Sequence, residues 1–338
     1  MLCVWVHRSP RPPADPLLRP ARRRGYLSPV TQAAPDHGVL GKLDVPLALG
    51  LLRLSTEGRP AEADAIDVIR FALDQGVRLL DTADSYALDD RDLHYGEHLV
   101  RKALAAWDGP REQVRVITKA GLARPKGRWV PNGRRDHLRK MVDGSLKALA
   151  VPRLFMLLLH VNDPKTPLEE SLAALAELQK EGKVEHLGLC NTSIAEVRQA
   201  QRHFQVQAIQ SELSVIDRSS GLAGLVALAR QMGVPFLAHR PLGGHAKAGN
   251  LLKNRAVKPI AARHNITPHE AALAALIDLG PPVIPVFGAT RRASVESSLR
   301  ALKVRFDARD RAELATKISF DASAEALAAT APPVTPAG

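Results

Sequence analysis

Short apolar segments alternate with amphipathic helical segments along most of this chain, and this alternation constrains the fold more than any other feature. We expect strands over residues 47–50, 77–80, 114–119, 154–160, 186–190, 206–211, 235–239 and 283–288. Helical periodicity lies between them, for example over 95–107, 136–149, 194–203, 222–232, 257–264 and 268–279. A helix after each strand indicates a parallel sheet, because parallel neighbours need a long crossover connection.

Eight such units within about 250 residues match a closed (β/α)₈ barrel, also called a TIM barrel. A doubly wound open sheet is the competing fold. That fold would normally carry G-x-G-x-x-G after its first strand, and neither this motif nor a P-loop occurs in the sequence. We therefore predict one barrel domain over residues 39–320.

The two ends of the chain differ from the barrel region in composition. Residues 1–38 are rich in proline and carry six arginines against two acidic residues, so we expect a disordered basic extension. They lack the apolar stretch of a signal peptide, while a targeting segment and an upstream-start artefact both stay open. Residues 321–338 are rich in alanine and proline and are expected to form a flexible tail.

The overall composition argues against several classes of protein. The net charge is +12, but no aromatic residues are interleaved with the basic ones as in single-stranded nucleic-acid grooves. No apolar run approaches the roughly 20 residues of a membrane span. The two cysteines, Cys3 and Cys190, provide no disulfide framework. We expect a cytoplasmic protein without nucleic-acid or membrane partners; the sequence does not indicate an oligomeric state.

Four polar residues stand at or just beyond the ends of successive expected strands. Asp81 and Tyr86 follow strand 77–80, Lys119 ends strand 114–119, and His160 ends strand 154–160. Catalytic groups of barrels lie at the carboxyl ends of the strands, so these side chains are expected to converge. Each one taken singly has an ordinary structural explanation, whereas the set indicates catalysis.

The chemistry of this set is proton donation to a carbonyl oxygen. A free tyrosine has a pKa of about 10, and the Lys119 ammonium, held by Asp81, is expected to lower the pKa of Tyr86. His160 would hydrogen-bond the same carbonyl oxygen. No side chain donates hydride, so a reduced cofactor is required.

Several motifs in fixed order resemble those of the aldo-keto reductases. They are Asp81-Thr82-Ala83-Asp84-Ser85-Tyr86 with Gly96-Glu97, Ile117-Thr118-Lys119, Leu158-Leu159-His160, Gly188-Leu189-Cys190-Asn191, Gln210 with Glu212, Pro241-Leu242-Gly243 and Ile284-Pro285-Val286-Phe287-Gly288. The resemblance spans about residues 43–305. It implies a (β/α)₈ barrel that reduces carbonyl compounds with NADPH. It also implies that Tyr86 is the proton donor, that Asp81 and Lys119 tune its acidity, and that His160 orients the carbonyl group.

The resemblance further implies a cofactor site. Its expected residues are Cys190, Asn191, Gln210, His239, Pro241, Leu242, Gly288, Arg291, Arg292 and Ser298. Cys190, His239 and Ser298 depart from the family's usual serine, aromatic ring and asparagine. Arg291 and Arg292 match positions near the adenosine 2′-phosphate, which favours NADPH over NADH, although ordinary surface arginines would look the same.

Substrate identity is carried mainly by the loops. Leu52, Arg53, Trp129 and Arg240 are expected to line the pocket. A basic cluster (Lys126, Arg128, Arg134 and Arg135) is consistent with an anionic substrate, with steering of the cofactor or with a solvated loop. Pyridoxal, sugar aldehydes and polyketide-type ketones all remain open. The alternative function is a nicotinamide-binding redox sensor or regulatory subunit without catalysis.

One histidine pair resembles a metal site without matching it. His94 and His98 have i,i+4 spacing with Glu97 beside them. This order is not H-E-x-x-H, and we expect no bound metal. Cys190 is expected to be a packed thiol rather than a nucleophile.

Overall fold

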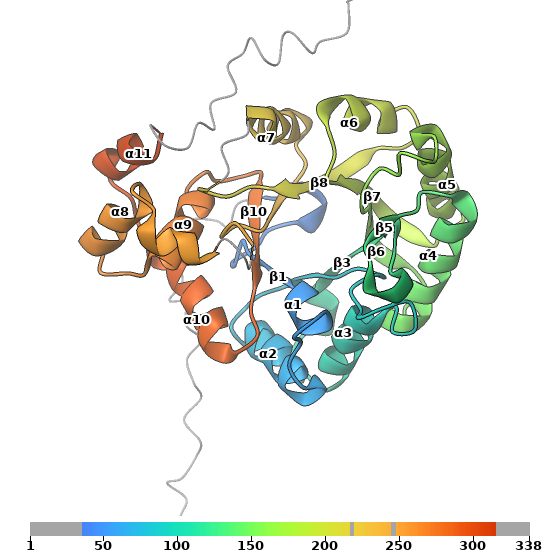
Figure 1. Cartoon of the computed structure of the whole chain (residues 1–338), viewed down its shortest axis with the longest axis horizontal. Coiled ribbons are helices and arrows are strands. Elements are labelled where there is room, and N and C mark those ends of the chain that lie inside the picture. Colours follow the sequence, from blue (N-terminus) through green and yellow to red (C-terminus); the bar gives the residue numbers. More distant parts are fainter. Residues whose placement is uncertain (1–35, 217–219, 245–247, 316–338) are drawn as a thin grey trace, which may run out of the picture.

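The predicted barrel is present. The structure is a computed structural model that describes residues 36–216, 220–244 and 248–315. Within these ranges eight parallel strands close into a ring, and helices surround the ring on its outside (Figure 1). This ring is a (β/α)₈ barrel. The open-sheet alternative is excluded because the first and last strands around the sheet are hydrogen-bonded to each other.

The strands follow one another around the ring in the order β1-β10-β9-β8-β7-β6-β3-β2. Their bounds are β1 Ala48–Gly50, β2 Leu79–Asp81, β3 Arg115–Ala120, β6 Leu154–Leu159, β7 Val184–Cys190, β8 Val206–Glu212, β9 Phe236–His239 and β10 Val283–Gly288. The largest relevant difference from expectation is at β2, which was expected to end at residue 80. Asp81 belongs to the strand, pairing with Gly50 and Ile117, so its position is fixed by the sheet.

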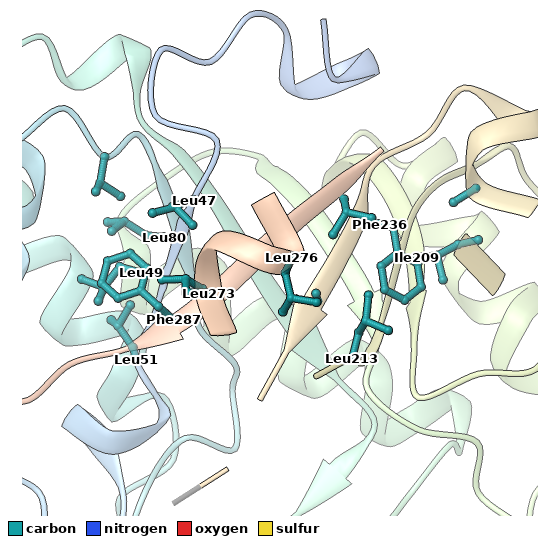
Figure 2. Close-up of a cluster of buried hydrophobic side chains, with 14 of the residues drawn as sticks. Leu47, Leu49, Leu51, Leu80, Ile209, Leu213, Phe236, Leu273, Leu276 and Phe287 are labelled. Carbon is teal, nitrogen blue, oxygen red and sulfur yellow. The ribbon is translucent and has the colours of Figure 1, made fainter. Parts of the chain in front are cut away.

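Side chains alternate between the inside of the barrel and the layer beneath the helices. The inner cluster includes Ala48, Leu79, Ile117 and Leu158. The outer cluster contains the intervening strand residues together with the buried faces of the helices. Figure 2 shows this outer layer where Leu273 and Leu276 of α9 lie with strand residues of the barrel wall. The two layers follow from the period of two in a strand.

The helices cover the outer face of the barrel. Their bounds are α1 Leu52–Ser55, α2 Glu62–Asp74, α3 Tyr95–Ala105, α4 Arg135–Leu149, α5 Leu168–Lys180, α6 Ile194–Ala200, α7 Ser220–Met232, α8 Val257–Arg263, α9 Pro268–Ile277, α10 Arg292–Arg300 and α11 Ala308–Ala315. Two features were not expected from the sequence: helix α1, and the small antiparallel pair β4 (Leu122–Ala123) and β5 (Val130–Pro131). Both lie in loops after barrel strands, where they shape the site.

The segment before β1 packs against the inner cluster of the barrel. The backbones of Asp36 and Lys42 form an isolated antiparallel β-bridge, and a 3₁₀ turn spans Gly38–Leu40. Leu40 and Leu43 belong to the inner cluster. Of the expected extension, residues 1–38, only residues 36–38 are among the described residues. The expected tail, residues 321–338, also lies outside them.

Candidate active site

The inner face of the barrel changes from apolar to polar at the carboxyl ends of its strands. Because inward positions repeat every second residue, Leu79 is followed by Asp81, Ile117 by Lys119, and Leu158 by His160. Ala208 and Leu237 are likewise followed by Gln210 and His239. The same strands that form the apolar interior therefore present a ring of polar groups at one end.

Lys119 is the centre of the predicted acid set. Its Nζ donates to Asp81 Oδ1 at 2.7 Å, to the Thr82 carbonyl oxygen at 2.8 Å and to Tyr86 Oη at 3.2 Å. The Lys119 side chain is 0% exposed and that of Asp81 is 3% exposed. The structure thus brings three of the four residues into direct contact, with all three ammonium hydrogens used.

Burial and charge act in opposite directions on this group. Burial disfavours the ammonium of Lys119, but the Asp81 carboxylate and the Tyr86 hydroxyl outweigh it and raise the pKa of Lys119. Burial raises the pKa of Tyr86 to about 12, although Lys119 lowers it. The expectation of a lowered tyrosine pKa is therefore wrong for the net effect, because desolvation of the phenolate exceeds the attraction of Lys119. At neutral pH Tyr86 is an uncharged phenol that holds its proton.

His160 completes the predicted set. It is buried directly after β6, and its ring lies edge-on to Tyr86 with the centroids 5.8 Å apart. Burial, assisted by Lys119 and His239, lowers the pKa of His160 well below its usual value. The imidazole is therefore neutral, and it can act as a hydrogen-bond donor to an oxygen but not as a cation.

A chain of hydrogen bonds joins the acid set to the expected nicotinamide residues. Gln210 Nε2 donates to Asp81 Oδ2 at 2.7 Å, and the Cys190 thiol donates to Gln210 Oε1 at 3.3 Å. Asn191 Nδ2 donates to the His160 carbonyl oxygen at 3.1 Å, and His239 Nε2 lies 2.8 Å from Asn191 Oδ1. Burial raises the pKa of Cys190 to about 12, in agreement with a packed, unreactive thiol.

These residues fit the carboxamide of a nicotinamide. Asn191 and Gln210 each offer both donor and acceptor atoms, which is the pattern that an amide requires. Asn191 directly follows β7 and is hydrogen-bonded to His160, and Gln210 lies near the end of β8 and is hydrogen-bonded to Asp81. The donor set is therefore suitable for this cofactor, with Cys190 contributing a weaker partner than a serine would.

The remaining expected cofactor residues lie around the outside of this group. Arg292 is paired with Asp67 of α2 and stacks over Phe71, with 5.2 Å from guanidinium to ring centre. The Ser298 hydroxyl donates to Ser294 O at 3.0 Å, within α10. Arg291 is exposed at the start of α10 and makes no ion pair with the described residues.

Three further positions of the expected cofactor site lie just after β9 or at the end of β10. Pro241 is buried and Leu242 packs against the outer apolar cluster. Gly288 is exposed at the end of β10, and a Cβ added there would lie 3.9 Å from Arg53 Cγ. Gly288 therefore lies beside Arg53, which was expected in the substrate pocket.

Of the expected pocket residues, Trp129 lies beside Tyr86, whereas Arg53 and Arg240 contact other residues. Trp129 lies near Tyr86 with ring centroids 6.5 Å apart, and 44% of it is exposed. Arg53 is on α1, and its Nη1 lies 3.5 Å from the Glu57 carbonyl oxygen. Arg240 is turned to Glu212, with Nη1 donating to Oε2 at 3.1 Å. Only Trp129 has a direct contact with the acid set among these.

Arg124, which was not expected to contribute to the site, supports Trp129. The Arg124 side chain is buried, its guanidinium lies 3.7 Å from the Trp129 ring centre, and Nη2 donates to Glu57, Ala87 and Leu88. Arg124 thereby joins the loop containing Tyr86 to the β4–β5 pair. Nothing in the local sequence distinguishes it from the neighbouring solvated arginines.

One histidine of the pair is hydrogen-bonded to the acidic residue beside it. His94 Nδ1 lies 2.6 Å from Glu97 Oε2, and the other Glu97 oxygen accepts a hydrogen bond from Thr118. The described residues contain no group of three or more potential metal ligands. In those same residues, no helix is long and apolar enough to span a membrane.

Comparisons with known proteins agree with the geometry. The sequence model described as "Aldo/keto reductase family" matches residues 46–319. A probable aldo-keto reductase from Glycine max is 30% identical over 283 residues, which is 75% of this chain and 79% of the relative.

Solved structures share the barrel. A glycerol dehydrogenase from Gluconobacter oxydans matches with a TM-score of 0.70 and 22% identity, over 90% of this chain and 98% of that one. An aldo/keto reductase from Klebsiella pneumoniae, solved in complex with NADP and acetate, matches with a TM-score of 0.69 and 21% identity, over 85% and 95% of the two chains. At these identities the matches support the fold.

Proposed function

The chain belongs to the aldo/keto reductase family, and on this basis we propose that it reduces an aldehyde or ketone to an alcohol, with Tyr86 as the proton donor. The observation that carries the proposal is the contact of Lys119 Nζ with both Asp81 and Tyr86, at 2.7 and 3.2 Å. A buried ammonium held against a phenol has a specific use in proton transfer, because it stabilises the phenolate that remains afterwards.

Each residue of the set then has a defined part. A reduced nicotinamide cofactor, when bound, would supply the hydride for the carbonyl carbon and would itself be oxidised. Tyr86 Oη gives its proton to the carbonyl oxygen, and Lys119 offsets the negative charge left on the phenolate. Asp81 holds Lys119 in place, and neutral His160 donates a hydrogen bond to the same carbonyl oxygen. The phenolate regains a proton from solvent before the next turnover.

We further propose NADPH rather than NADH as the cofactor. Support comes from Arg291, whose exposed guanidinium makes no ion pair with the described residues and stands at the start of α10. A guanidinium suits a phosphate because it forms charge-assisted hydrogen bonds. Arg292 supports the proposal less, since Asp67 already neutralises it.

The position of Trp129 beside Tyr86 favours a planar carbonyl compound as substrate. Trp129 is 44% exposed beside Tyr86, and Arg124 covers one face of its ring. An exposed indole at this position provides a surface for stacking against a flat substrate. Arg53, which is not ion-paired within the described residues, would favour an anionic substituent on that substrate, whereas Arg240 is already neutralised by Glu212.

The test is oxidation of NADPH and NADH, followed by absorbance, with a panel of aliphatic, aromatic and anionic aldehydes and ketones. We expect turnover with NADPH and a preference for planar carbonyls. Tyr86→Phe should lower kcat about 100- to 10,000-fold, the usual contribution of a general acid, and leave the cofactor Kd within about twofold. If the cofactor binds but the whole panel is inert, the redox-sensor alternative replaces the reductase.

A further inference from the structure

Arg124 is a fully buried cation that lies outside the acid set. Its side chain is 0% exposed, although its ion-pair partner Glu57, in the loop between α1 and α2, is 64% exposed. Arg124 Nη2 lies 2.6 Å from Glu57 Oε1. It also lies 3.0 Å from the Ala87 carbonyl oxygen and 2.9 Å from that of Leu88. These two residues directly follow Tyr86, so the guanidinium holds the backbone next to the proposed proton donor.

The face of the same guanidinium is covered by the indole of Trp129. Arg124 Cζ lies 3.7 Å from the ring centre, while Nε and Nη1 have no hydrogen-bond partner among the described residues. A desolvated guanidinium is attracted to the π face of an indole. The charge of Arg124 is therefore compensated by Glu57 through Nη2 and by Trp129 across its face. The indole consequently has a preferred position, although Trp129 is 44% exposed.

The β4–β5 pair brings Arg124 and Trp129 together. Arg124 directly follows β4 and Trp129 directly precedes β5, so the two residues face each other across the connecting turn. Gly127 in this turn has a φ of 78°, in the left-handed region that favours glycine. A Cβ added to Gly127 would lie 3.2 Å from the Leu88 carbonyl oxygen, closer than a side chain usually comes. The glycine thus allows the turn to approach the chain that follows Tyr86.

These contacts set the position of the indole relative to the phenol. The rings of Trp129 and Tyr86 are 6.5 Å apart, with their planes at 83°. Arg124 occupies one face of the indole, so the exposed part of Trp129 lies away from Arg124. The hydroxyl of Tyr86 is held separately by Lys119. Loss of Arg124 would therefore release the indole more than the phenol.

We propose that the Glu57–Arg124 ion pair determines substrate specificity by fixing the Trp129 indole beside Tyr86. The indole then selects carbonyl compounds that carry a flat aromatic ring next to the carbonyl group, because aromatic rings gain from stacked or edge-on contact with one another. Arg124 is a positioning residue, since a side chain with no exposed surface acts on a ligand only through Trp129. The effect on specificity rests on the proposed function, whereas the fixed position of the indole does not.

The direct test is ¹⁹F NMR of the cofactor-free protein labelled with fluorotryptophan, in which the Trp129 signal is identified by its loss in Trp129→Phe. We expect this signal to shift or broaden in Arg124→Met, and to change less in Glu57→Gln, which keeps an acceptor for Nη2 but loses the charge. Arg124→Lys keeps a cation for Glu57 and for the ring, so its signal should lie between those of the unmodified protein and Arg124→Met. Glu62→Gln removes another exposed carboxylate that is ion-paired. It is the matched control and should leave the signal unchanged.

Kinetics with benzaldehyde and propanal supply a second readout. In Arg124→Met the ratio of kcat/KM for benzaldehyde to that for propanal should fall about five- to tenfold, the contribution of about one aromatic contact. The fall should come from a higher KM for benzaldehyde. Trp129→Leu should lower the ratio by a similar factor, and adding Arg124→Met to it should lower the ratio no further, because both residues act through one contact. A merely structural Arg124 would instead lower kcat/KM for both aldehydes alike.

Two results would overturn the proposal. One is a Trp129 signal that stays unchanged in Glu57→Gln or in folded Arg124→Met. The other is an equal loss of kcat/KM for benzaldehyde and propanal in either variant. Glu57 is largely exposed, so Glu57→Gln gives both readouts even where Arg124→Met fails to fold. If the signal responds but no carbonyl compound is turned over by the unmodified protein, the proposed function fails and the fixed position of the indole stands.

Discussion

The floor of the candidate site and its rim satisfy their polar atoms in different ways. We define the floor as Asp81, Tyr86, Lys119, His160 and Gln210, and the rim as Arg240, Arg291, Arg292 and Ser298. Floor residues are at most 8% exposed, and Asp81, Tyr86, Lys119 and Gln210 are hydrogen-bonded to one another. Rim residues are exposed or half-buried, and those with polar partners use neighbours outside the floor.

This difference indicates when each part becomes organised. A buried ammonium or carboxylate must find its partner as the chain folds, because an unpaired charge would prevent burial. The floor is therefore complete before any ligand arrives. The rim faces no such requirement. Arg240 and Arg292 pair with the nearby carboxylates of Glu212 and Asp67, and a ligand would have to compete for these two arginines.

The largest effect is expected from breaking the floor at Lys119. Lys119→Met leaves the Asp81 carboxylate buried without its cation, which should lower the free energy of unfolding by about 3–5 kcal/mol and abolish activity. Urea denaturation measures the first effect, and carbonyl reduction measures the second. Lys102→Met is the control, since that lysine and its partner Glu62 are 43% and 44% exposed, and it should cost at most about 1 kcal/mol.

A double substitution separates the two roles of the floor. Asp81→Leu combined with Lys119→Met removes both charges, and it should recover most of the stability, because apolar replacements of buried ion pairs are often neutral or stabilising. Activity should not recover. Full stability in Lys119→Met alone would show that Asp81 is not held by this pair.

Much of the floor could be predicted from the sequence because strand periodicity determines it. The inward alternation that places Leu79 in the apolar interior also places Asp81 at its edge, and the same holds for Ile117 and Lys119. The family's motifs then identify the polar ends. These features are local, so a single sequence contains them.

The parts that were not predicted depend on closure of the barrel and on depth of burial. Gln210 meets Asp81 across 129 residues of sequence, a contact that exists only once β8 and β2 share one barrel. The direction of the Tyr86 pKa shift depends on whether desolvation or Lys119 is stronger. The role of Arg124 depends on three loops meeting. None of these quantities is encoded in spacing along the chain.

His239 lies between floor and rim, and an intermediate effect is expected there. Burial, then Lys119 and Arg240, lower its pKa to about 3, so it is neutral when folded. The unfolded chain takes up a proton on this residue below about pH 6.5. The contribution of neutral His239 to stability is therefore complete above that pH and is lost as the pH falls toward 3.

His239→Gln should make the protein less sensitive to acid. Glutamine does not titrate, and it retains an N–H group for the contact that His239 Nε2 makes with Asn191 Oδ1. Between pH 6.5 and 5 the variant should lose about 1–2 kcal/mol less than the unmodified protein, as measured by urea denaturation at each pH. Identical pH dependence in the two proteins would mean that this imidazole is solvated in solution.

The smallest effect on ligand binding is expected at the rim. It tests whether Arg291 and Arg292, at the start of α10, contribute equally to cofactor binding. Arg291→Ala should weaken NADPH binding about fivefold, close to 1 kcal/mol, a value typical of an exposed charge-assisted contact. Arg292→Ala should weaken it less, because this guanidinium must first leave Asp67. Isothermal titration measures both, and NADH affinity should stay the same in each variant. A larger loss at Arg292 would show that a bound phosphate displaces Asp67, and the rim would then be rearranged by its ligand rather than merely occupied by it.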